Sequence, residues 1–288
     1  MEKNILVTGG AGFIGSNLIK FLKHKNNSIT SIDNYSSGKI SNHISGVNYI
    51  DLDILQIENF KNKHFDFCFH LAAQSRVQPS FDNPINSYQS NVTGTLKVIE
   101  WTKKNNIKTI YAGSSSRHHD PSASPYAMTK FLGEEVCKMF KKSFDSNIEI
   151  ARFYNVYGPN EAVDIKFGNV IGIWRKKIEQ GEKLTIVGDG EQRRDFIHVE
   201  DLVDGLYKIA LSNDSNDDAW ELGTGINYSI NELYDFFNKR FNVDFERIDD
   251  QPGNYRETIR VNDDSIKRLK WKPKDRLKKY IFDLNNNN

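Results

Sequence analysis

The first half of the chain alternates short apolar, β-branched runs with longer segments of helical periodicity. The apolar runs predict strands at 5–8, 28–32, 47–52, 67–72, 108–112 and 149–153. The helical pattern predicts helices at 13–24, 84–104 and 125–142. Buried parallel strands are apolar throughout rather than alternating, and the segment from Cys68 to Ala73 follows that rule. The alternation predicts an α/β fold with a parallel sheet and crossover helices.

The pattern changes after Gly158-Pro159, where the polar loops become longer. A turn is predicted at 188–190, followed by helices near 199–211 and 230–240. We expect a larger lobe from residues 1–165 plus about 195–215, and a smaller C-terminal α/β lobe from about 166–194 and 216–288. No internal repeat or low-complexity linker separates them. A cleft between the two lobes is therefore the expected ligand site.

Composition limits the class of partner. The 288 residues carry 39 Lys and Arg against 38 Asp and Glu, and the net charge of +1 gives no general attraction to nucleic acids or anionic membranes. Hydrophobic residues make up 38% of the chain, and no apolar run approaches the ~18 residues of a membrane-spanning helix. Residues 1–7 show no signal-peptide pattern. We expect a cytoplasmic protein without nucleic-acid or membrane partners; the two cysteines show no metal-ligand spacing, and no metal site is predicted.

Three glycines follow the first predicted strand and open the first predicted helix: Gly9, Gly12 and Gly15. Glycine there permits a tight turn, close approach of the backbone to a pyrophosphate and close packing of helix on strand, while the helix N-terminus attracts the anion. Asp33 lies 18 residues after Gly15, just past the second strand. A carboxylate at that position binds a ribose diol and repels a 2′-phosphate. The pattern predicts a Rossmann doubly wound sheet that binds NAD rather than NADP.

Tyr126 and Lys130 are four positions apart in a segment of strong helix propensity, so both side chains project from one helix face. A free tyrosine titrates near ~10, and a neighbouring ammonium and a nicotinamide cation both favour the phenolate. The pair therefore fits acid/base chemistry. Tyr35 and Lys39 have the same spacing, but the Ser-Ser-Gly sequence between them argues against a helix.

A run of three serines, 114–116, follows the predicted strand at 108–112. Ligands bind at the C-terminal ends of strands in open parallel sheets, so these hydroxyls could hold a sugar oxygen, although a serine run is also typical of a polar loop. A serine hydrolase would combine Ser116 with His119 and Asp120. The chain has no G-x-S-x-G elbow, however, and triad members are rarely so close in sequence.

Together these residues resemble the extended short-chain dehydrogenase/reductase family, and within it the NAD-dependent nucleotide-sugar epimerases and dehydratases. The resemblance covers nearly the whole chain and rests on motifs that occur in the same order. The matching segments are Val7–Gly15, Asp33-Asn34, Asp51–Asp53, His70–Ala73, Asn91–Thr95, Ser124–Lys130, Arg152–Pro159, Gly188–Phe196 and Pro252–Arg256.

The resemblance implies a role for each matching position. The implied cofactor residues, besides the three glycines, are Phe13 and Ile14 at the NAD diphosphate, Asp33 and Asn34 at the adenosine ribose, Asp53 and Ile54 at the adenine, and Leu71, Ala72 and Ala73 along the cleft. Tyr126 would be the catalytic base, Lys130 would tune it and hold the nicotinamide ribose, and Ser114 would bind the sugar hydroxyl. The implied substrate residues are Ser114, Ser115, Asn155, Arg194 and Arg256, the last three at the sugar-nucleotide diphosphate, which suits the forked donors of arginine.

The resemblance also bears on the reaction and the assembly. In 4,6-dehydratases an Asp-Glu pair follows the catalytic hydroxyl residue, whereas this chain has Ser115 and Ser116 there, which disfavours dehydration and, by the same test, glucuronate decarboxylation. The prediction is 4-epimerisation of a UDP-sugar. An NAD(P)H-dependent ketosugar reductase, a 4,6-dehydratase and a non-catalytic dinucleotide sensor stay open as alternative functions.

The resemblance also implies a homodimer that forms through the helices near 84–104 and 125–142. It places NAD on the larger lobe and the nucleotide sugar on the smaller lobe.

The chain departs from the family pattern between the serines and the tyrosine. His118 and His119 replace the usual Tyr-Gly, and only 12 positions separate Ser114 from Tyr126. The rim of the sugar pocket must therefore differ from that of the family. The two histidines could contact substrate, bind an adventitious metal or be solvated. His70 and His198, in strand-like segments, are expected to be core histidines.

Overall fold

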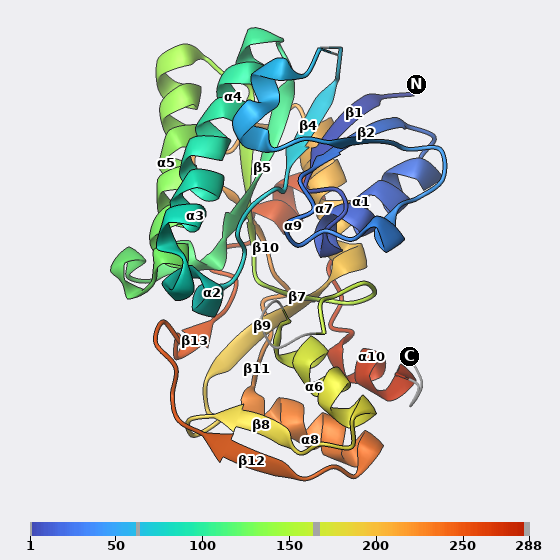
Figure 1. Cartoon of the computed structure of the whole chain (residues 1–288), viewed down its shortest axis with the longest axis vertical. Helices are drawn as coiled ribbons and strands as arrows, with labels where there is room; N and C mark the ends of the chain where they lie inside the picture. Colours follow the sequence, from blue (N-terminus) through green and yellow to red (C-terminus); the bar gives the residue numbers. More distant parts are fainter. Residues whose placement is uncertain (1, 62–63, 164–167, 285–288) are drawn as a thin grey trace.

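Seven parallel strands form the central sheet of the computed structural model, which describes residues 2–61, 64–163 and 168–284. The strands are β1 (Asn4–Thr8), β2 (Ser28–Asp33), β3 (Asn48–Asp51), β4 (Phe67–His70), β5 (Lys108–Ser114), β6 (Ile148–Phe153) and β10 (Trp220–Leu222). Their order is β10-β6-β5-β4-β1-β2-β3 (Figure 1). The strand order reverses beside β1, which pairs with β2 and β4. The predicted Rossmann-type α/β fold is confirmed.

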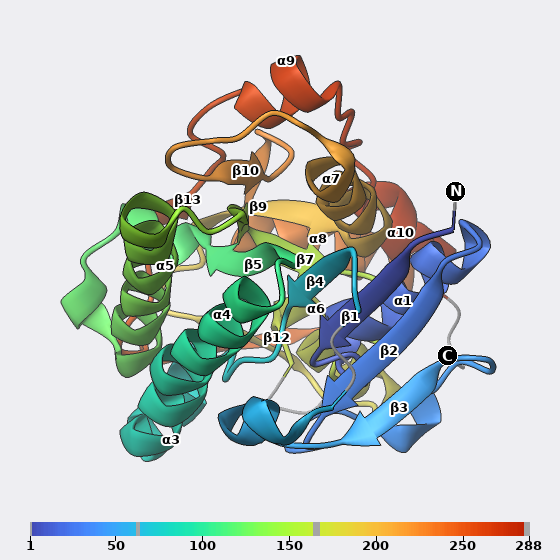
Figure 2. The ribbon, with the colours of Figure 1, turned by 90° about the horizontal axis from the view of Figure 1, so that it is seen from above.

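Helices cover both faces of this sheet (Figure 2). α1 (Phe13–His24) and α7 (Val199–Leu211) pack on one face, and α4 (Thr95–Lys104) and α5 (Pro125–Phe144) pack on the other. Ile5 contributes to the apolar layer under α1 and α7, whereas Leu6 contributes to the layer that contains Val98 of α4. Successive strand side chains point to opposite faces, so a strand covered on both faces must be apolar at every position.

The long helices begin and end close to their predicted bounds. α1 and α7 match the predicted 13–24 and 199–211, and α5 continues two residues beyond 142. The predicted helix at 84–104 is present as α3 (Pro84–Tyr88), a π-helical turn (Gln89–Gly94) and α4. A short helix before it, α2 (Val77–Asp82), adds to the predicted elements.

The smaller lobe contains short strands that the sequence pattern did not predict. β9 (Arg193–His198) pairs with three strands, namely β7 (Asn155–Tyr157), β11 (Asn227–Ser229) and β13 (Glu257–Thr258), and β8 (Leu184–Val187) pairs with β12 (Phe245–Ile248). The helices here are α6 (Val170–Glu179), α8 (Ile230–Phe241) and α10 (Leu277–Asp283). They close a second apolar core around Trp174, Phe237 and Leu277.

The larger lobe takes in part of the chain that was expected in the smaller one. β10 pairs with β6 at the edge of the central sheet, although residues 216–288 were assigned to the smaller lobe. Trp271, which follows α9 (Asp264–Leu269), is fully buried in the core under α1 and α7. The expected boundary at 165/166 lies outside the described residues.

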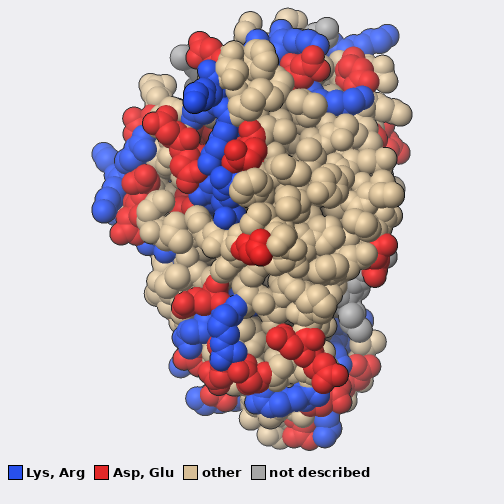
Figure 3. All heavy atoms as spheres, turned by 90° about the vertical axis from the view of Figure 1, so that its left-hand side faces the viewer, with Lys and Arg blue, Asp and Glu red and all other residues tan. Residues whose placement is uncertain are grey.

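One outer face of the larger lobe carries little charge. Figure 3 shows a broad area without Lys, Arg, Asp or Glu on the side where α3, α4 and α5 lie in Figure 1. Exposed apolar residues on these helices include Ile85, Tyr88 and Leu96. Among the described residues, no helix is long and apolar enough to cross a membrane.

Candidate active site

A cavity of about 950 Å³ lies between the C-terminal ends of the central strands and the smaller lobe. Every cofactor residue predicted from the sequence lines it: Gly9, Gly12, Phe13, Ile14, Gly15, Asp33, Asn34, Asp53, Ile54, Leu71, Ala72, Ala73, Tyr126 and Lys130. Ser114, Ser115, Asn155 and Arg194 line it as well, whereas Arg256 does not. The cavity therefore combines the two predicted sites, and it opens beside β1, where ligands bind in doubly wound sheets.

The glycine loop cannot carry side chains at two positions. Gly9 has a φ of +73°, and a Cβ on it would lie 2.8 Å from the backbone nitrogen of Ala72. A Cβ on Gly15 would lie 2.1 Å from the carbonyl oxygen of Gly9. The loop leads directly into the N-terminus of α1, whose first turn holds no acidic residue. This end of the cavity is thus a cradle of backbone that fits a dinucleotide pyrophosphate.

Two carboxylates define the next part of the cavity. Asp33, at the end of β2, accepts hydrogen bonds from the backbone nitrogens of Ala11 at 2.9 Å and Tyr35 at 2.8 Å. Asp53 accepts one from the Asn34 side chain at 2.8 Å. Asp33 therefore ties the glycine loop to the turn after β2, and the acidic pair fits the ribose and adenine of a dinucleotide better than a second phosphate.

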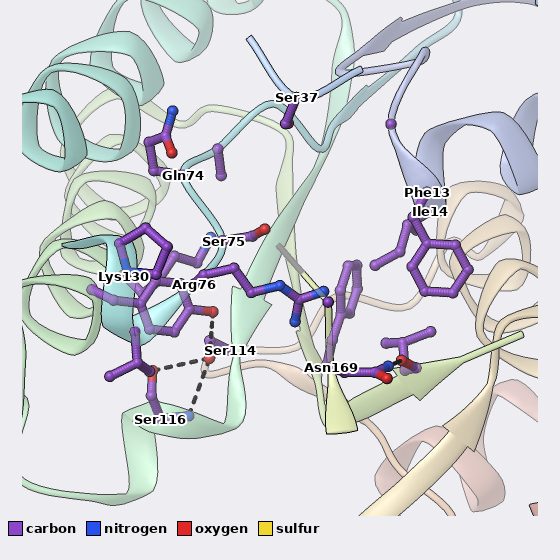
Figure 4. A pocket seen from close by; sticks show the side chains of 18 of the residues that line it. Phe13, Ile14, Ser37, Gln74, Ser75, Arg76, Ser114, Ser116, Lys130 and Asn169 are labelled. Carbon is purple, nitrogen blue, oxygen red and sulfur yellow. Dashed lines mark hydrogen bonds between the residues drawn. The ribbon is translucent and has the colours of Figure 1, made fainter. Parts of the chain in front are cut away.

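Tyr126 and Ser114 meet at the opposite end of the cavity. Ser124 caps α5 by accepting a hydrogen bond from the backbone nitrogen of Ala127, and Pro125 occupies the first turn. This start places Tyr126 toward the end of β5, where its hydroxyl donates to Ser114 Oγ at 3.2 Å (Figure 4). Ser116 also donates to Ser114 Oγ, from its hydroxyl at 2.9 Å.

Lys130 is buried one helical turn after Tyr126. Its Nζ donates to the hydroxyl of Tyr111 at 3.2 Å and to the carbonyl oxygen of Ala112. Burial lowers the pKa of Lys130 to about 8, against the opposing effect of the Glu134 carboxylate. At neutral pH the side chain is therefore an ammonium that loses its proton more readily than that of a free lysine.

The phenol of Tyr126 is held in its neutral form in the free protein. Burial raises its pKa, while the hydrogen bond with Ser114 and the positive charge of Arg76 act in the opposite direction. The phenol must lose its proton before it can act as a base. A further positive charge beside it would favour that loss.

A buried charge network supports the end of β5. The Glu134 carboxylate accepts from the backbone nitrogen of Ser114 at 3.3 Å and from the guanidinium of Arg152 at 2.9 Å. Arg152 also contacts Glu221 at 3.0 Å, and Glu221 contacts His118 Nε2 at 2.9 Å. The serine segment is therefore anchored from below by paired charges, which is the arrangement that a buried ion needs.

The structure separates the two predicted phosphate arginines. Arg194 lines the cavity and donates to the backbone oxygen of Arg193 at 2.8 Å and to the Asn254 side chain at 2.5 Å. Burial lowers its pKa to about 10, so the site favours an anion beside it. Arg256 is 67% exposed and forms an ion pair with Asp189 at 2.8 Å. Contrary to the expectation from the resemblance, Arg256 does not line the cavity, because its side chain faces solvent.

Arg76 and Tyr255 are among the cavity residues that sequence reasoning missed. Arg76 lies between β4 and α2 and reaches into the cavity between Ser114 and Asn169 (Figure 4). Its place just past the end of a central strand was the signal that could have identified it. Tyr255 also lines the cavity, directly before Arg256 in a segment that the resemblance had matched. No pattern in the sequence distinguishes the inward from the outward residue of that loop.

The histidines have defined surroundings. His70 is buried between the hydroxyls of Thr8 at 2.8 Å and Thr95 at 3.2 Å, and burial lowers its pKa to about 3. His198 is 6% exposed and caps α7, so both predictions of core histidines are confirmed. His118 contacts Glu221, and His119 stacks on Tyr255. No group of three or more His, Cys, Asp or Glu among the described residues could hold a metal ion.

Comparison with known proteins agrees with the fold and the motifs. The profile of the NAD dependent epimerase/dehydratase family matches residues 5–223. An uncharacterized UDP-glucose epimerase of Bacillus subtilis, YtcB, is 33% identical over 71% of this chain and 72% of that protein. A UDP-N-acetyl-alpha-D-glucosaminuronate decarboxylase of Bacillus cytotoxicus is 30% identical over 81% of this chain and 78% of that protein. The crystal structure of UDP-glucose 4-epimerase from Thermotoga maritima with UDP-glucose superposes with a TM-score of 0.88, at 28% identity, over 97% of this chain and 96% of that one.

Proposed function

The chain belongs to the NAD-dependent epimerase/dehydratase family, and from this premise we propose that it catalyses epimerisation at C4 of a UDP-hexose. The observation that carries the proposal is the hydrogen bond from Tyr126 to Ser114 at the far end of a cavity that begins at the glycine loop. NAD is the cofactor of this family. A bound dinucleotide with its pyrophosphate on the loop would extend toward this pair of hydroxyls.

The residues around the hydroxyl pair suit a reversible oxidation of one carbon. NAD supplies the acceptor and donor of the hydride when it is bound. Ser114 holds the C4 hydroxyl, and Tyr126 removes the hydroxyl proton and later returns it. Lys130, as an ammonium one turn away, stabilises the phenolate form of Tyr126. The sugar regains the two electrons that it lost, so the overall reaction consumes no cofactor.

The charges along the cavity favour epimerisation over elimination. Among the described residues that line it, the acidic ones are Asp33 and Asp53, both at the adenosine end. Ser115 and Ser116 follow the catalytic serine, where an elimination would need carboxyl groups to protonate the leaving hydroxyl and remove a second proton. A hydroxyl pair can position a sugar but cannot supply that general acid.

We assign the nucleotide sugar to the side of the cavity formed by the smaller lobe. Arg194, at the start of β9, offers a guanidinium to the diphosphate. Asn155 is held toward the same region by donating to Thr258 Oγ1 at 3.1 Å and to the Asp195 backbone oxygen at 3.3 Å. In this assignment the larger lobe binds NAD.

A second candidate is a reaction on a sugar acid. One curated relative is named as a uronate decarboxylase, and Arg76 places a guanidinium inside the cavity. A guanidinium recognises a carboxylate through two parallel hydrogen bonds. A uronate substrate would therefore use Arg76, and its decarboxylation would release CO₂ where an epimerase would not.

The test is NMR of the purified protein incubated with UDP-, GDP-, CDP- and dTDP-sugars, UDP-glucuronate included, without added NAD. The proposal expects a C4 epimer of a UDP-hexose to accumulate, because bound NAD is regenerated in each turnover. Net consumption of added NADH with a 4-keto sugar nucleotide would instead identify a reductase. Loss of CO₂ from UDP-glucuronate would favour the second candidate, and no turnover of any sugar would leave a dinucleotide-binding protein.

A further inference from the structure

Residues 251–255 form a strap that runs from the smaller lobe across the Tyr126 end of the cavity. The strap follows β12 and precedes β13, and Gln251, Gly253, Asn254 and Tyr255 line the cavity. It is fastened to the larger lobe, because the Gln78 side chain donates to the Pro252 backbone oxygen at 2.9 Å. A Cβ on Gly253 would lie 2.8 Å from the Val77 side chain, which shows how closely the strap approaches α2.

The strap is also fastened by two stacked rings. The imidazole of His119 and the phenol of Tyr255 have centroids 4.0 Å apart and planes only 10° apart. His119 is held in turn, since its backbone nitrogen donates to the Ser116 oxygen at 3.1 Å and the preceding His118 contacts Glu221. The shortened segment between Ser114 and Tyr126 thus contacts the smaller lobe through the imidazole ring of His119.

The hydroxyl of Tyr255 is buried and makes no hydrogen bond of good geometry with the described residues, although the Ser124 side chain lies near enough to it to lower its pKa. It lines the cavity close to Tyr126, and burial together with Tyr126 raises its pKa to about 12, with Ser124 and Arg194 acting in the opposite direction. At neutral pH the group is therefore a donor. A buried hydroxyl without a partner costs free energy, and a ligand oxygen in the cavity would remove that cost.

We propose that Tyr255 is a specificity-determining residue for the sugar: its hydroxyl donates a hydrogen bond to an oxygen of the hexosyl group, and its stack on His119 keeps the strap over that group. The inference rests on the proposed function, since it takes the sugar to lie beside Tyr126. The role of Tyr255 differs from that of Arg194, because a neutral phenol suits a hydroxyl or carbonyl oxygen rather than a phosphate. The two histidines that depart from the family pattern then share one task, which is to hold this wall of the sugar site.

The test separates the sugar from the nucleotide. The NAD-loaded protein is titrated with UDP alone and with whichever of UDP-glucose and UDP-N-acetylglucosamine the wild type epimerises. Tyr255→Phe keeps the ring and removes the hydroxyl. We expect its affinity for UDP to stay within about twofold, its affinity for the UDP-sugar to fall about 3- to 10-fold, as for one lost hydrogen bond, and kcat to change little.

Variants of His119 test the stack. His119→Ala should weaken UDP-sugar binding in the same way, and His119→Phe, which retains an aromatic ring, should recover most of it. His43→Ala is the matched control, because His43 stacks on Tyr49 with centroids 3.7 Å apart and does not line this cavity. Thermal unfolding of each variant checks that the fold is intact.

The outcomes are distinguishable. If the wild type epimerises a UDP-sugar and Tyr255→Phe binds that sugar as tightly as the wild type, the inference is wrong and the proposed function stands. An equal loss for UDP and for the UDP-sugar would also overturn it, because the residue would then act on the nucleotide or on the fold. If the wild type epimerises no sugar nucleotide, the proposed function fails and the inference fails with it.

Discussion

Tyr126 donates its hydroxyl hydrogen to Ser114 Oγ over 3.2 Å, which joins the first turn of α5 to the last residue of β5. The two residues are only 12 positions apart in the chain. The contact requires the segment between them to turn back tightly, and the two 3₁₀ turns Ser115–His118 and Pro121–Ala123 do this. The shortened segment therefore preserves the hydroxyl pair and alters what surrounds it.

Replacing the phenol tests this pair directly. Tyr126→Phe should lower kcat by about 10²- to 10⁴-fold, the usual contribution of a general acid–base group, while the affinity for UDP-sugar changes little. Epimer formation by NMR and binding by titration calorimetry measure the two effects. Tyr35→Phe is the control, since Tyr35 has the same spacing to a lysine but bonds to His43 and does not line the cavity. Near-normal turnover of Tyr126→Phe would refute the catalytic assignment.

The charge of Arg76 should be visible in the pH dependence. Its positive charge lowers the pKa of Tyr126, so Arg76→Gln should raise that pKa. Because the phenolate is the active base, activity increases as pH rises through the pKa, and the rising limb of kcat against pH should move to higher pH in the variant. Arg256→Gln, outside the cavity, should leave the profile in place. A rising limb that stays where it is in Arg76→Gln would show that Arg76 does not act on the base.

The two arginines that the resemblance placed at the diphosphate should behave differently. Arg194→Gln should weaken UDP binding by about 10- to 100-fold, because it removes charge-assisted hydrogen bonds in a buried site. Arg256→Gln should change it less than about twofold, because Arg256 pairs with Asp189 at the surface. Titration with UDP measures both. Equal losses would mean that Arg256 turns inward when the nucleotide binds.

The larger lobe was predictable because its signals are local and repeated. A glycine loop fixes the start of α1, and alternating apolar strands and amphipathic helices fix the order of the sheet. β10 has three residues, and β13 has two, so neither is long enough to show a period. Arg256 and Tyr255 are adjacent, and the backbone oxygen of Arg256 accepts from Arg193. Which of the two faces the cavity depends on that pairing with β9, which the sequence does not encode locally.

The buried carboxylate beneath Ser114 should matter for stability. Glu134→Gln removes one of the three carboxylates that pair with the buried Arg152; the other two are the buried Glu221 and the half-exposed Asp218. Removing one member of a buried pair costs about 3–5 kcal/mol, so the free energy of unfolding in urea should fall by that order. Glu100→Gln is the matched control, since Glu100 pairs with Lys104 at the surface and such pairs contribute about 0–1 kcal/mol. Similar losses in both variants would argue against a buried network.

The apolar area on the α3–α5 side of the larger lobe should be the interface between two copies of the chain (Figure 3). Ile85 of α3 is 70% exposed, and Tyr88 of α3, Leu96 of α4 and Met139 of α5 are also exposed. Apolar surface of this kind is removed from water when a second copy covers it. Ile85→Asp would bury a charge at that contact, so sedimentation velocity should show a monomer where the wild type is a dimer. Ile40→Asp is the control, because Ile40 is 72% exposed but lies outside these helices, and it should stay dimeric. A wild type that sediments as a monomer, or an Ile85→Asp variant that sediments as a dimer, would assign this face another role.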